Sequence, residues 1–319
     1  MKAIALALLI VSLPCWGQGY PSKPVRLVIP VGAGSLADVV PRLIQPALEE
    51  KLGQRIVIEH RPGAGGNLGA QAVLAAPADG YTLLMAPTNL LVINQFVFRD
   101  MKFDPLADFA PISLIAEVPL ILQVHPSLPA NTLDEFIRHA KANPGRLNYG
   151  SPSTGTIPHV AMEILARAAG LSLVHVPFKG GAPATNALIA NDIQAMLIGY
   201  GTTAGQMRGG QVRPLAVASA TRLAALPQVP TFAEAGFADL QAAVPSNWWG
   251  MVAPKGTPAP VVQRWAGEIR AALADPATRA KYEDLGLTPV GSTPEAFGAG
   301  LPDQARKWEA VIRTLPRIE

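Results

Sequence analysis

Short apolar segments of strand length alternate along this chain with segments of helical periodicity. The apolar segment Pro24–Pro30 precedes apolar residues at helical spacing up to Leu52, and Gly53 is placed to cap that helix. Further strands are expected at Arg55–Glu59 and Thr82–Ala86. Because such alternation arises when crossover helices join neighbouring parallel strands, it predicts an α/β fold with a mainly parallel sheet.

The second half of the chain continues this alternation. Strands are expected at Val118–Val124, Leu147–Gly150, Leu173–Phe178, Ile193–Ile198, Leu215–Ala218 and Trp248–Ala253. Thr132 and Glu135 have the spacing of a capping box, which begins a helix ending near Gly145. Another helix is expected over His159–Ala169, and three helices close the chain. Pro46, inside the first helix, should kink or shorten it. At 319 residues the chain is long enough for about two domains, each with its own core.

Residues 1–19 have the layout of a secretory signal peptide. A positive start at Met1-Lys2 precedes the apolar run Ala3–Val11, and small residues follow. This run is too short to span a membrane, which takes about 20 apolar residues. The only cysteine, Cys15, lies inside the signal, so the exported chain needs no disulfide. A lipoprotein anchored at Cys15 is the alternative, which Pro14 disfavours.

Composition and motifs argue against several classes of function. The formal net charge is +3 and the basic residues are dispersed, so nucleic acid is not expected as a partner. The glycines of Gly63–Gly69 do not fit the dinucleotide pattern G-x-G-x-x-G and indicate a tight turn entering a helix. No two of the five histidines have metal-ligand spacing, so neither a metal ion nor a cofactor is expected. A catalytic pair of Ser151 with His159 stays open, although nothing supplies a third member.

Two loops between a strand and a helix have the composition of anion sites. They are Pro30–Asp38 and Tyr149–His159, both rich in glycine, hydroxyl and small residues. The N-terminus of a helix has unpaired N–H groups and about half a positive charge, so it binds anions. Glycine lets a ligand approach the backbone, and serine or threonine adds donors. The alternative is that Ser35 and Thr156 only cap their helices.

Both loops belong to a series of motifs that recurs in the same order in one known family. The series consists of P-x-x-x-G-x-x-x-D within Pro24–Asp38, then Glu59–Asn67, Pro77–Leu83, Tyr149–His159, Val176–Gly180, Val229–Phe237 and Ala253–Pro260. Together these motifs cover nearly the whole exported chain. They resemble the Bug family, the solute receptors of tripartite tricarboxylate transporters.

The resemblance implies a two-lobed periplasmic binding protein of type II, or Venus flytrap, with a mainly parallel sheet in each lobe. Lobe one would combine residues 20–121 and 246–319, and lobe two would be residues 122–245. The chain would cross between the lobes near Val118–Val124 and near Trp248–Ala253. In similar proteins the two loops grip a ligand carboxylate, with ordered water at the first loop, and the lobes close by a hinge motion.

The ligand-binding candidates come from these loops and from two further strand ends. They are Val31, Gly34, Ser35, Asp38, Asn89, Ser151, Ser153, Thr154, Gly155, Thr156, His159 and Ile198. Asp38 could instead orient its loop as a helix-start carboxylate, and His159 could cap its helix. Lys179 either attracts an anion at the cleft edge or is solvated. Trp248 and Trp249 are either hinge packing or a lid over the ligand.

Departures from the family pattern concern the ligand. Ser35 replaces the second of two glycines usual in the first loop, Val31 stands where phenylalanine is usual, and Ala37 where a hydroxyl residue is usual. In the family, an acidic residue often follows the strand that corresponds to the one ending near Ile198. Such an acid could pair with an amine of the ligand. This chain has no acidic residue there. The sequence therefore favours a plain organic acid or an aromatic acid over an amino acid.

The resemblance implies a non-catalytic receptor in the periplasm that delivers a small carboxylate to membrane transporter subunits, and a monomer is expected. The first alternative is a receptor that presents its ligand to a sensor protein. The second is a serine hydrolase that uses Ser151 or Ser153. Neither alternative has a motif of its own in the sequence.

Overall fold

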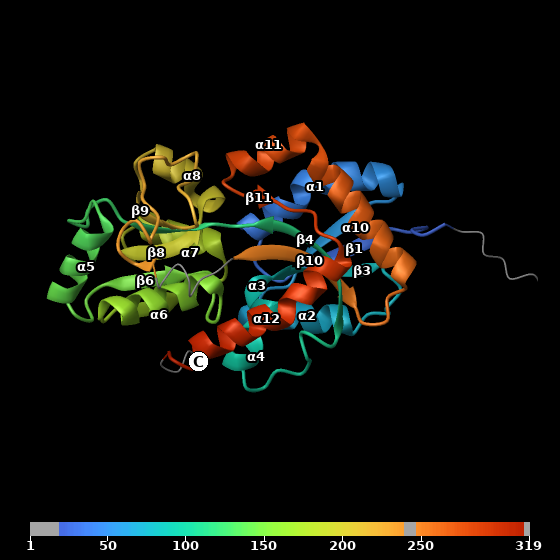
Figure 1. Ribbon diagram of the computed structural model, residues 1–319, viewed down its shortest axis with the longest axis horizontal. Helices are drawn as coiled ribbons and strands as arrows, with labels where there is room; N and C mark the ends of the chain where they lie inside the picture. Colours follow the sequence, from blue (N-terminus) through green and yellow to red (C-terminus); the bar gives the residue numbers. More distant parts are fainter. Residues whose placement is uncertain (1–18, 239–246, 316–319) are drawn as a thin grey trace, which may run out of the picture.

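The computed structural model describes residues 19–238 and 247–315, and it contains two β-sheets in two lobes that lie side by side (Figure 1). The strands of the first sheet are β1 (Val25–Ile29), β2 (Ile56–His60), β3 (Thr82–Pro87), β4 (Phe109–Glu117), β10 (Trp248–Pro254) and β11 (Thr288–Pro289). Those of the second are β5 (Leu120–Val124), β6 (Asn148–Ser151), β7 (Val174–Pro177), β8 (Ala195–Gly199) and β9 (Arg213–Ala218). The strand orders are β11-β4-β10-β3-β1-β2 and β7-β6-β8-β5-β9. The expected two-lobed α/β fold is confirmed.

Helices surround both sheets. In the first lobe they are α1 (Leu36–Leu52), α2 (Asn67–Leu74), α3 (Thr88–Val92), α4 (Asn94–Val97), α10 (Ala259–Ala274), α11 (Pro276–Asp284) and α12 (Pro294–Ile312). In the second lobe they are α5 (Leu133–Ala142), α6 (Ile157–Ala169), α7 (Gly181–Ile189) and α8 (Tyr200–Arg208). A short 3₁₀ turn, Ala64–Gly66, precedes α2, as expected for the glycine-rich segment. None of the described helices is long and apolar enough to cross a membrane.

Strand pairing is mixed in both sheets, so the expectation of mainly parallel sheets is wrong. In the first sheet β1 runs parallel to β2 and β3, but β10 runs antiparallel to β3 and β4. In the second sheet β6 runs parallel to β7 and β8, but β5 runs antiparallel to β8 and β9. The reason is the connection between the lobes. The chain leaves the first sheet at the end of β4 and re-enters it through β10, so these two strands run in opposite directions.

Local signals in the sequence explain most helix ends. Gly53 ends α1 with a left-handed φ of 66°, and its N–H donates to the Glu49 carbonyl. The capping box of α5 is present, because the Glu135 N–H donates to Thr132 Oγ1 over 3.2 Å. Of the two expected effects of Pro46, shortening of α1 does not occur, because the helix continues to Leu52. Pro46 lies on the exposed side of the helix, where water can bond the carbonyl that a proline leaves unpaired.

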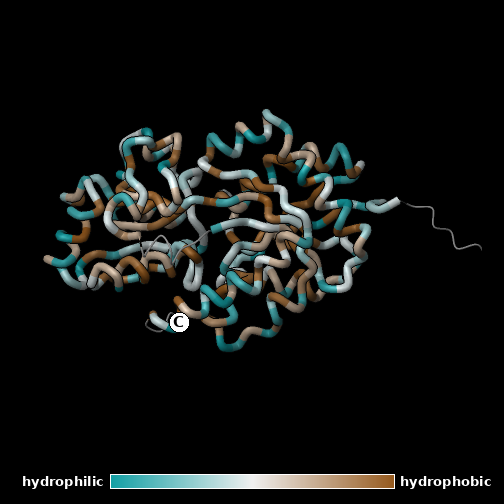
Figure 2. The backbone as a smooth tube through the Cα atoms, viewed as in Figure 1, coloured by the Kyte–Doolittle hydropathy of each residue, from teal (hydrophilic) through white to brown (hydrophobic). Residues whose placement is uncertain are grey.

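The two lobes share part of their core. Figure 2 shows the apolar colours concentrated along the strands, and one cluster of buried side chains includes Leu84 of β3, Leu120 of β5 and Leu197 of β8. Where the chain crosses, the Val118 N–H donates to the Asn247 carbonyl over 2.7 Å. Trp248 is 1% exposed beside this point and packs edge-to-face on a phenylalanine ring of α12. It is therefore packed inside the protein at this crossing, which favours packing over a lid, the two roles considered for it.

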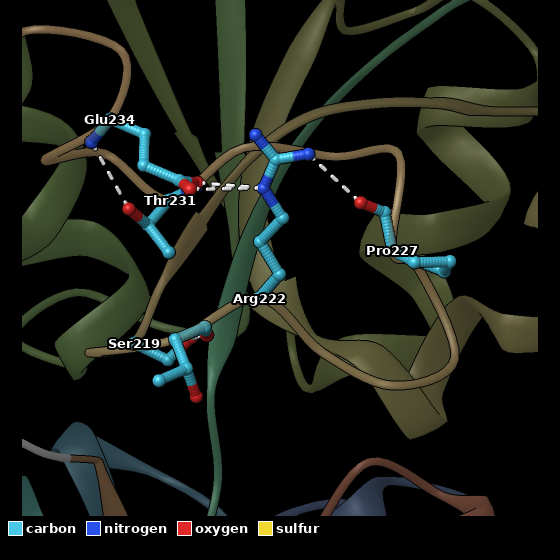
Figure 3. Close-up of polar contacts among 6 residues, drawn as sticks. Ser219, Arg222, Pro227, Thr231 and Glu234 are labelled. Atoms are coloured by element: carbon cyan, nitrogen blue, oxygen red, sulfur yellow. Dashed lines mark hydrogen bonds and ion pairs between the residues drawn. The ribbon is translucent and has the colours of Figure 1, made fainter.

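The segment after β9 returns along that strand and is held by polar contacts. The N–H of Val217 donates to the Pro230 carbonyl over 2.9 Å. Figure 3 shows the Arg222 guanidinium between the Glu234 carboxylate, 2.8 Å away, and the Pro227 carbonyl. This pair is half-exposed, so solvent screening keeps its contribution to stability small. The contacts fix the path of the chain toward the second crossing.

Two predictions fall on residues that the structure does not describe. The signal peptide, residues 1–19, lies outside the described residues except for Gly19. The expected lobe boundary at residues 245 and 246 lies in the undescribed range 239–246.

Candidate functional site

A cavity of about 410 Å³ lies where strands of both sheets end. Pro30 follows β1, Pro87 ends β3, Pro152 follows β6 and Gly199 ends β8, and all four line the cavity. In α/β proteins the carboxyl ends of parallel strands are the usual place for a ligand, because the loops there connect to helix N-termini. Both lobes thus contribute loops to one binding space.

Five helices of eight or more residues begin at this cavity, and so does the short helix α3. The lining includes the first residues or caps of α1, α2, α6, α7 and α8, namely Ser35, Leu36, Gly66, Thr156, Ile157, Gly180, Gly181 and Gly199. Each helix start contributes partial positive charge and unpaired N–H groups. Among the described lining residues Lys179 is the charged one, and no carboxylate is present. The cavity therefore favours a negatively charged ligand.

The Asp38 carboxylate fixes the conformation of the first loop. Gly34 has a φ of 75°, and its N–H donates to Asp38 Oδ2 over 3.2 Å. Arg42 donates to the other oxygen over 2.9 Å, and His60 Nε2 lies 3.0 Å from it. Burial favours the protonated acid, but these hydrogen bonds outweigh it and lower the pKa of Asp38 below its usual value. Asp38 therefore stays ionised and orients the loop.

Next to Asp38, the start of α1 has hydrogen-bond donors that remain available. Ser35 is 7% exposed and lines the cavity, and its Oγ has no hydrogen-bond partner within the described residues. No partner is found there for the N–H groups of Ser35 and Leu36 either. Ser35 does not cap its helix through its side chain, so the capping-only interpretation fails for this loop. Its donors remain available to a ligand.

The second loop repeats this construction with a histidine. Gly155 has a φ of 77°, and its N–H donates to His159 Nδ1 over 3.1 Å. His159 occupies the third residue of α6, as Asp38 does in α1. Thr156 does not cap α6, because its Oγ1 donates to the Ser153 carbonyl over 2.7 Å. The Ile157 N–H has no partner among the described residues.

His159 belongs to a buried stack of aromatic rings. Its ring lies 3.8 Å from that of His175, which in turn stacks on Tyr149 at 4.9 Å. Burial lowers the pKa of His159 to about 3, with a smaller contribution from His175, and burial lowers the pKa of His175 to about 4. Both rings are therefore neutral near pH 7, and the Gly155 bond requires His159 Nδ1 to be unprotonated.

The serine–histidine contact in this region differs from the one considered in the sequence. Ser151 Oγ lies 2.7 Å from His175 Nε2, not beside His159, and it donates to the Ser153 carbonyl over 3.0 Å. Ser151 is fully buried and does not line the cavity. A nucleophile must reach its substrate, so this pair has the position of a structural support.

Acidification is expected to destabilise the protein through these two histidines. The unfolded chain takes up protons near pH 6.5, whereas folded His159 and His175 stay neutral to about pH 3 and 4. Unfolding therefore binds protons, and the free energy of unfolding falls as the pH drops below about 6.5. Between pH 7 and pH 5 we expect the free energy of unfolding to fall by about 2–4 kcal/mol because of these two histidines.

Urea unfolding at both pH values measures this loss. The variant His159→Asn has an amide oxygen to accept the Gly155 N–H and no titrating group. It should show about half of the wild-type loss. Equal losses in the two proteins would contradict the assignment to His159.

The predicted ligand-binding residues divide into two groups. Six line the cavity: Val31, Ser35, Asn89, Ser153, Thr156 and Ile198. Six do not line it: Gly34, Asp38, Ser151, Thr154, Gly155 and His159. The Asn89 amide donates to the Gly65 carbonyl over 2.8 Å and to Asn94 Oδ1 over 3.0 Å, so both of its donors are already engaged.

Sequence reasoning identified Val31 and Ile198 but missed other apolar residues of the lining. Val118, Leu120 and Phe178 line the cavity and were not candidates. Trp249 lines it as well, in contrast to its buried neighbour Trp248, so hinge packing describes only one of the two tryptophans. For Val118, Leu120 and Trp249 the available signal was their position next to the lobe crossings, whereas Phe178 follows β7, away from both.

Comparisons with known proteins agree with this geometry. A family described as tripartite tricarboxylate transporter family receptor matches residues 40–316. Protein BugT of Bordetella pertussis is 31% identical over 304 residues, which is 95% of this chain and 92% of that protein. A UPF0065 protein of the tcbD-tcbE intergenic region of Pseudomonas sp. strain P51 is 34% identical, over 92% of this chain and 87% of that protein.

Solved structures of similar proteins share the fold closely. The periplasmic binding protein BugD superposes with a TM-score of 0.87 at 31% identity, covering 92% of this chain and 98% of BugD. R. palustris Rpa4515 with adipate has a TM-score of 0.87 at 33% identity, with coverage of 92% and 98%. MatC from Rhodopseudomonas palustris with bound malate has a TM-score of 0.86 at 30% identity, with coverage of 92% and 100%.

Proposed function

The chain belongs to the tripartite tricarboxylate transporter receptor family, and on that premise we propose that it is an exported, non-catalytic receptor that binds a small carboxylate between its lobes. The observation that carries the proposal is the convergence of five helix N-termini on a cavity whose described lining contains no acid. The buried, unpartnered Ser35 Oγ adds a donor at the same place. The similar proteins Rpa4515 and MatC hold adipate and malate, which are both carboxylates.

Binding would close the two lobes over the ligand. We assign residues 20–121 and 246–319 to one lobe and 122–245 to the other. The two sheets support this division, although β5 of the second sheet begins at Leu120, two residues before the assigned boundary. The lobes already touch near the loops. A Cβ atom at Gly155 would lie 3.1 Å from the ring of Phe98, and Arg167 of α6 donates to the Thr314 carbonyl beyond α12. Opening at these contacts would admit the ligand, and closing would complete its hydrogen bonds.

The proposed receptor acts in the periplasm after removal of residues 1–19, as a monomer that delivers its ligand to membrane transporter subunits. Membership of a receptor family supports delivery over catalysis. The buried position of Ser151 supports it further, because a hydrolase would need that hydroxyl in the cavity. Nucleic acid is not among the proposed partners.

A pair of loop variants tests the location of the site. Ser153 lines the cavity, whereas its neighbour Thr154 does not. Ser153→Ala should weaken binding of the carboxylate by about tenfold, because a hydrogen bond to a charged group contributes about 1.5–3 kcal/mol. Thr154→Ala is the matched control and should bind normally. Calorimetric titration measures both, and an unchanged affinity in Ser153→Ala would place the ligand elsewhere.

A further inference from the structure

The base of the cavity is apolar. Val118 and Leu120 lie where the chain passes from β4 to β5, Trp249 lies on β10 where it returns, and Ile198 lies near the end of β8. Phe178 adds an aromatic ring after β7. These five side chains come from both crossings and from the second lobe. We call them the cavity floor.

The charged and hydrogen-bonding groups of the cavity come mainly from the loops. Ser35, Ser153 and Thr156 lie at the starts of α1 and α6, and Lys179 lies just before α7. The carbonyl of Lys179 is close to the first loop, since a Cβ atom at Gly32 would lie 2.8 Å from it. The loops of the two lobes therefore approach each other here. Apart from Asn89, Thr202 and Asn247, the rest of the described lining offers mainly apolar side chains and backbone groups.

Resting on the proposed function, we infer that the ligand is a carboxylate whose remaining part is aromatic and uncharged. A cavity of about 410 Å³ with a mostly apolar lining and few polar groups is typical of a ligand with a sizeable apolar body. Trp249 and Phe178 provide ring faces and edges against which another ring packs favourably.

The charged groups of the lining further restrict which charged groups the ligand can have. An ammonium group on the ligand would lack a carboxylate partner among the described lining residues, and burying an unpaired charge is costly. Thr202 and Asn247 also line the cavity, but most of the lining surface is apolar, so a second carboxylate there would exchange most of its hydration for apolar contacts. Both arguments select a single acid group on an apolar body.

A panel of four compounds tests this selection by calorimetry on the full exported chain. The panel consists of benzoate, adipate, phenylalanine and benzyl alcohol. We expect benzoate to bind at least about tenfold more tightly than adipate or phenylalanine, a difference of about 1.4 kcal/mol or more. Tighter binding of adipate, or no binding of benzoate, would overturn the inference and leave the proposed carboxylate receptor standing. Benzyl alcohol binding as tightly as benzoate would instead contradict the proposed function, because the acid would then be dispensable.

A variant at the floor provides a second readout. Trp249→Leu keeps an apolar side chain but removes the ring. It should weaken benzoate by about fivefold or more and adipate by distinctly less, because only a ligand with a ring loses the aromatic contact. Thermal unfolding confirms that the variant is folded. An equal loss for benzoate and adipate would show that Trp249 acts on the fold alone and would overturn the assigned role.

Discussion

Replacing Ser35 by aspartate is expected to abolish most ligand binding, with affinity for the carboxylate falling about 100-fold, or about 2.8 kcal/mol. Ser35 precedes α1 and lines the cavity, and its Oγ has no hydrogen-bond partner among the residues that the structure describes. An aspartate there would place a fixed negative charge where the ligand's own carboxylate is proposed to lie. The two like charges would repel in a poorly hydrated space, and the new side chain would occupy the free N–H groups.

The same substitution should leave the fold intact. Aspartate is among the residues preferred at a helix N-cap, because its oxygen accepts the N–H groups of the first turn. Ser35→Asn is the matched control, since asparagine caps as well and has nearly the same shape without the charge. We expect it to weaken binding much less than Ser35→Asp. Calorimetry and thermal unfolding of both variants give the comparison, and equal affinities for the two would rule out an anion site at α1.

Replacing Gly32 by alanine is expected to weaken ligand binding about tenfold or more by holding the lobes apart. A Cβ atom at Gly32 would lie 2.8 Å from the carbonyl oxygen of Lys179, which belongs to the other lobe. Backbone atoms cannot turn aside as a side-chain end can, so the two loops must separate. Gly32 is not among the glycines with positive φ, so alanine adds no backbone strain in the open form.

Gly205→Ala serves as the control for this experiment. Gly205 lies in α8, and a Cβ atom there would meet no atom within 4 Å. Both variants should unfold at nearly the wild-type temperature without ligand. Small-angle X-ray scattering should show that the acid compacts wild type and Gly205→Ala but not Gly32→Ala. Wild-type affinity and compaction in Gly32→Ala would mean that closure does not depend on this approach of the loops.

Local patterns predicted the elements of the fold better than their pairing. Apolar runs and glycine caps identified β1, α1 and α6 close to their observed ends. The nine-residue strand β4 was not predicted, although it forms one of the two crossings. It contains Pro111, which removes a backbone donor and argues against a strand. Its antiparallel partner β10 is far away in the sequence, so no local pattern indicates the pairing.

The candidate site was predicted in its location but only in part of its residues. Glycine and hydroxyl residues before α1 and α6 indicated both loops, because helix starts have a local signature. Whether a side chain enters the cavity or braces the loop depends on tertiary contacts. Asp38 and His159 turn to the N–H groups of Gly34 and Gly155 instead of entering the cavity. The cavity floor combines residues near positions 118, 198 and 249, which only the folded chain brings together.

A crystal structure of the exported chain with its tightest-binding acid measures the central claim directly. The account predicts that the carboxylate bonds the Leu36 N–H of α1 and the Ile157 N–H of α6 at the same time. Each bond is either direct or passes through one water. A carboxylate bound at only one of these helix starts, or outside the cavity, would contradict it.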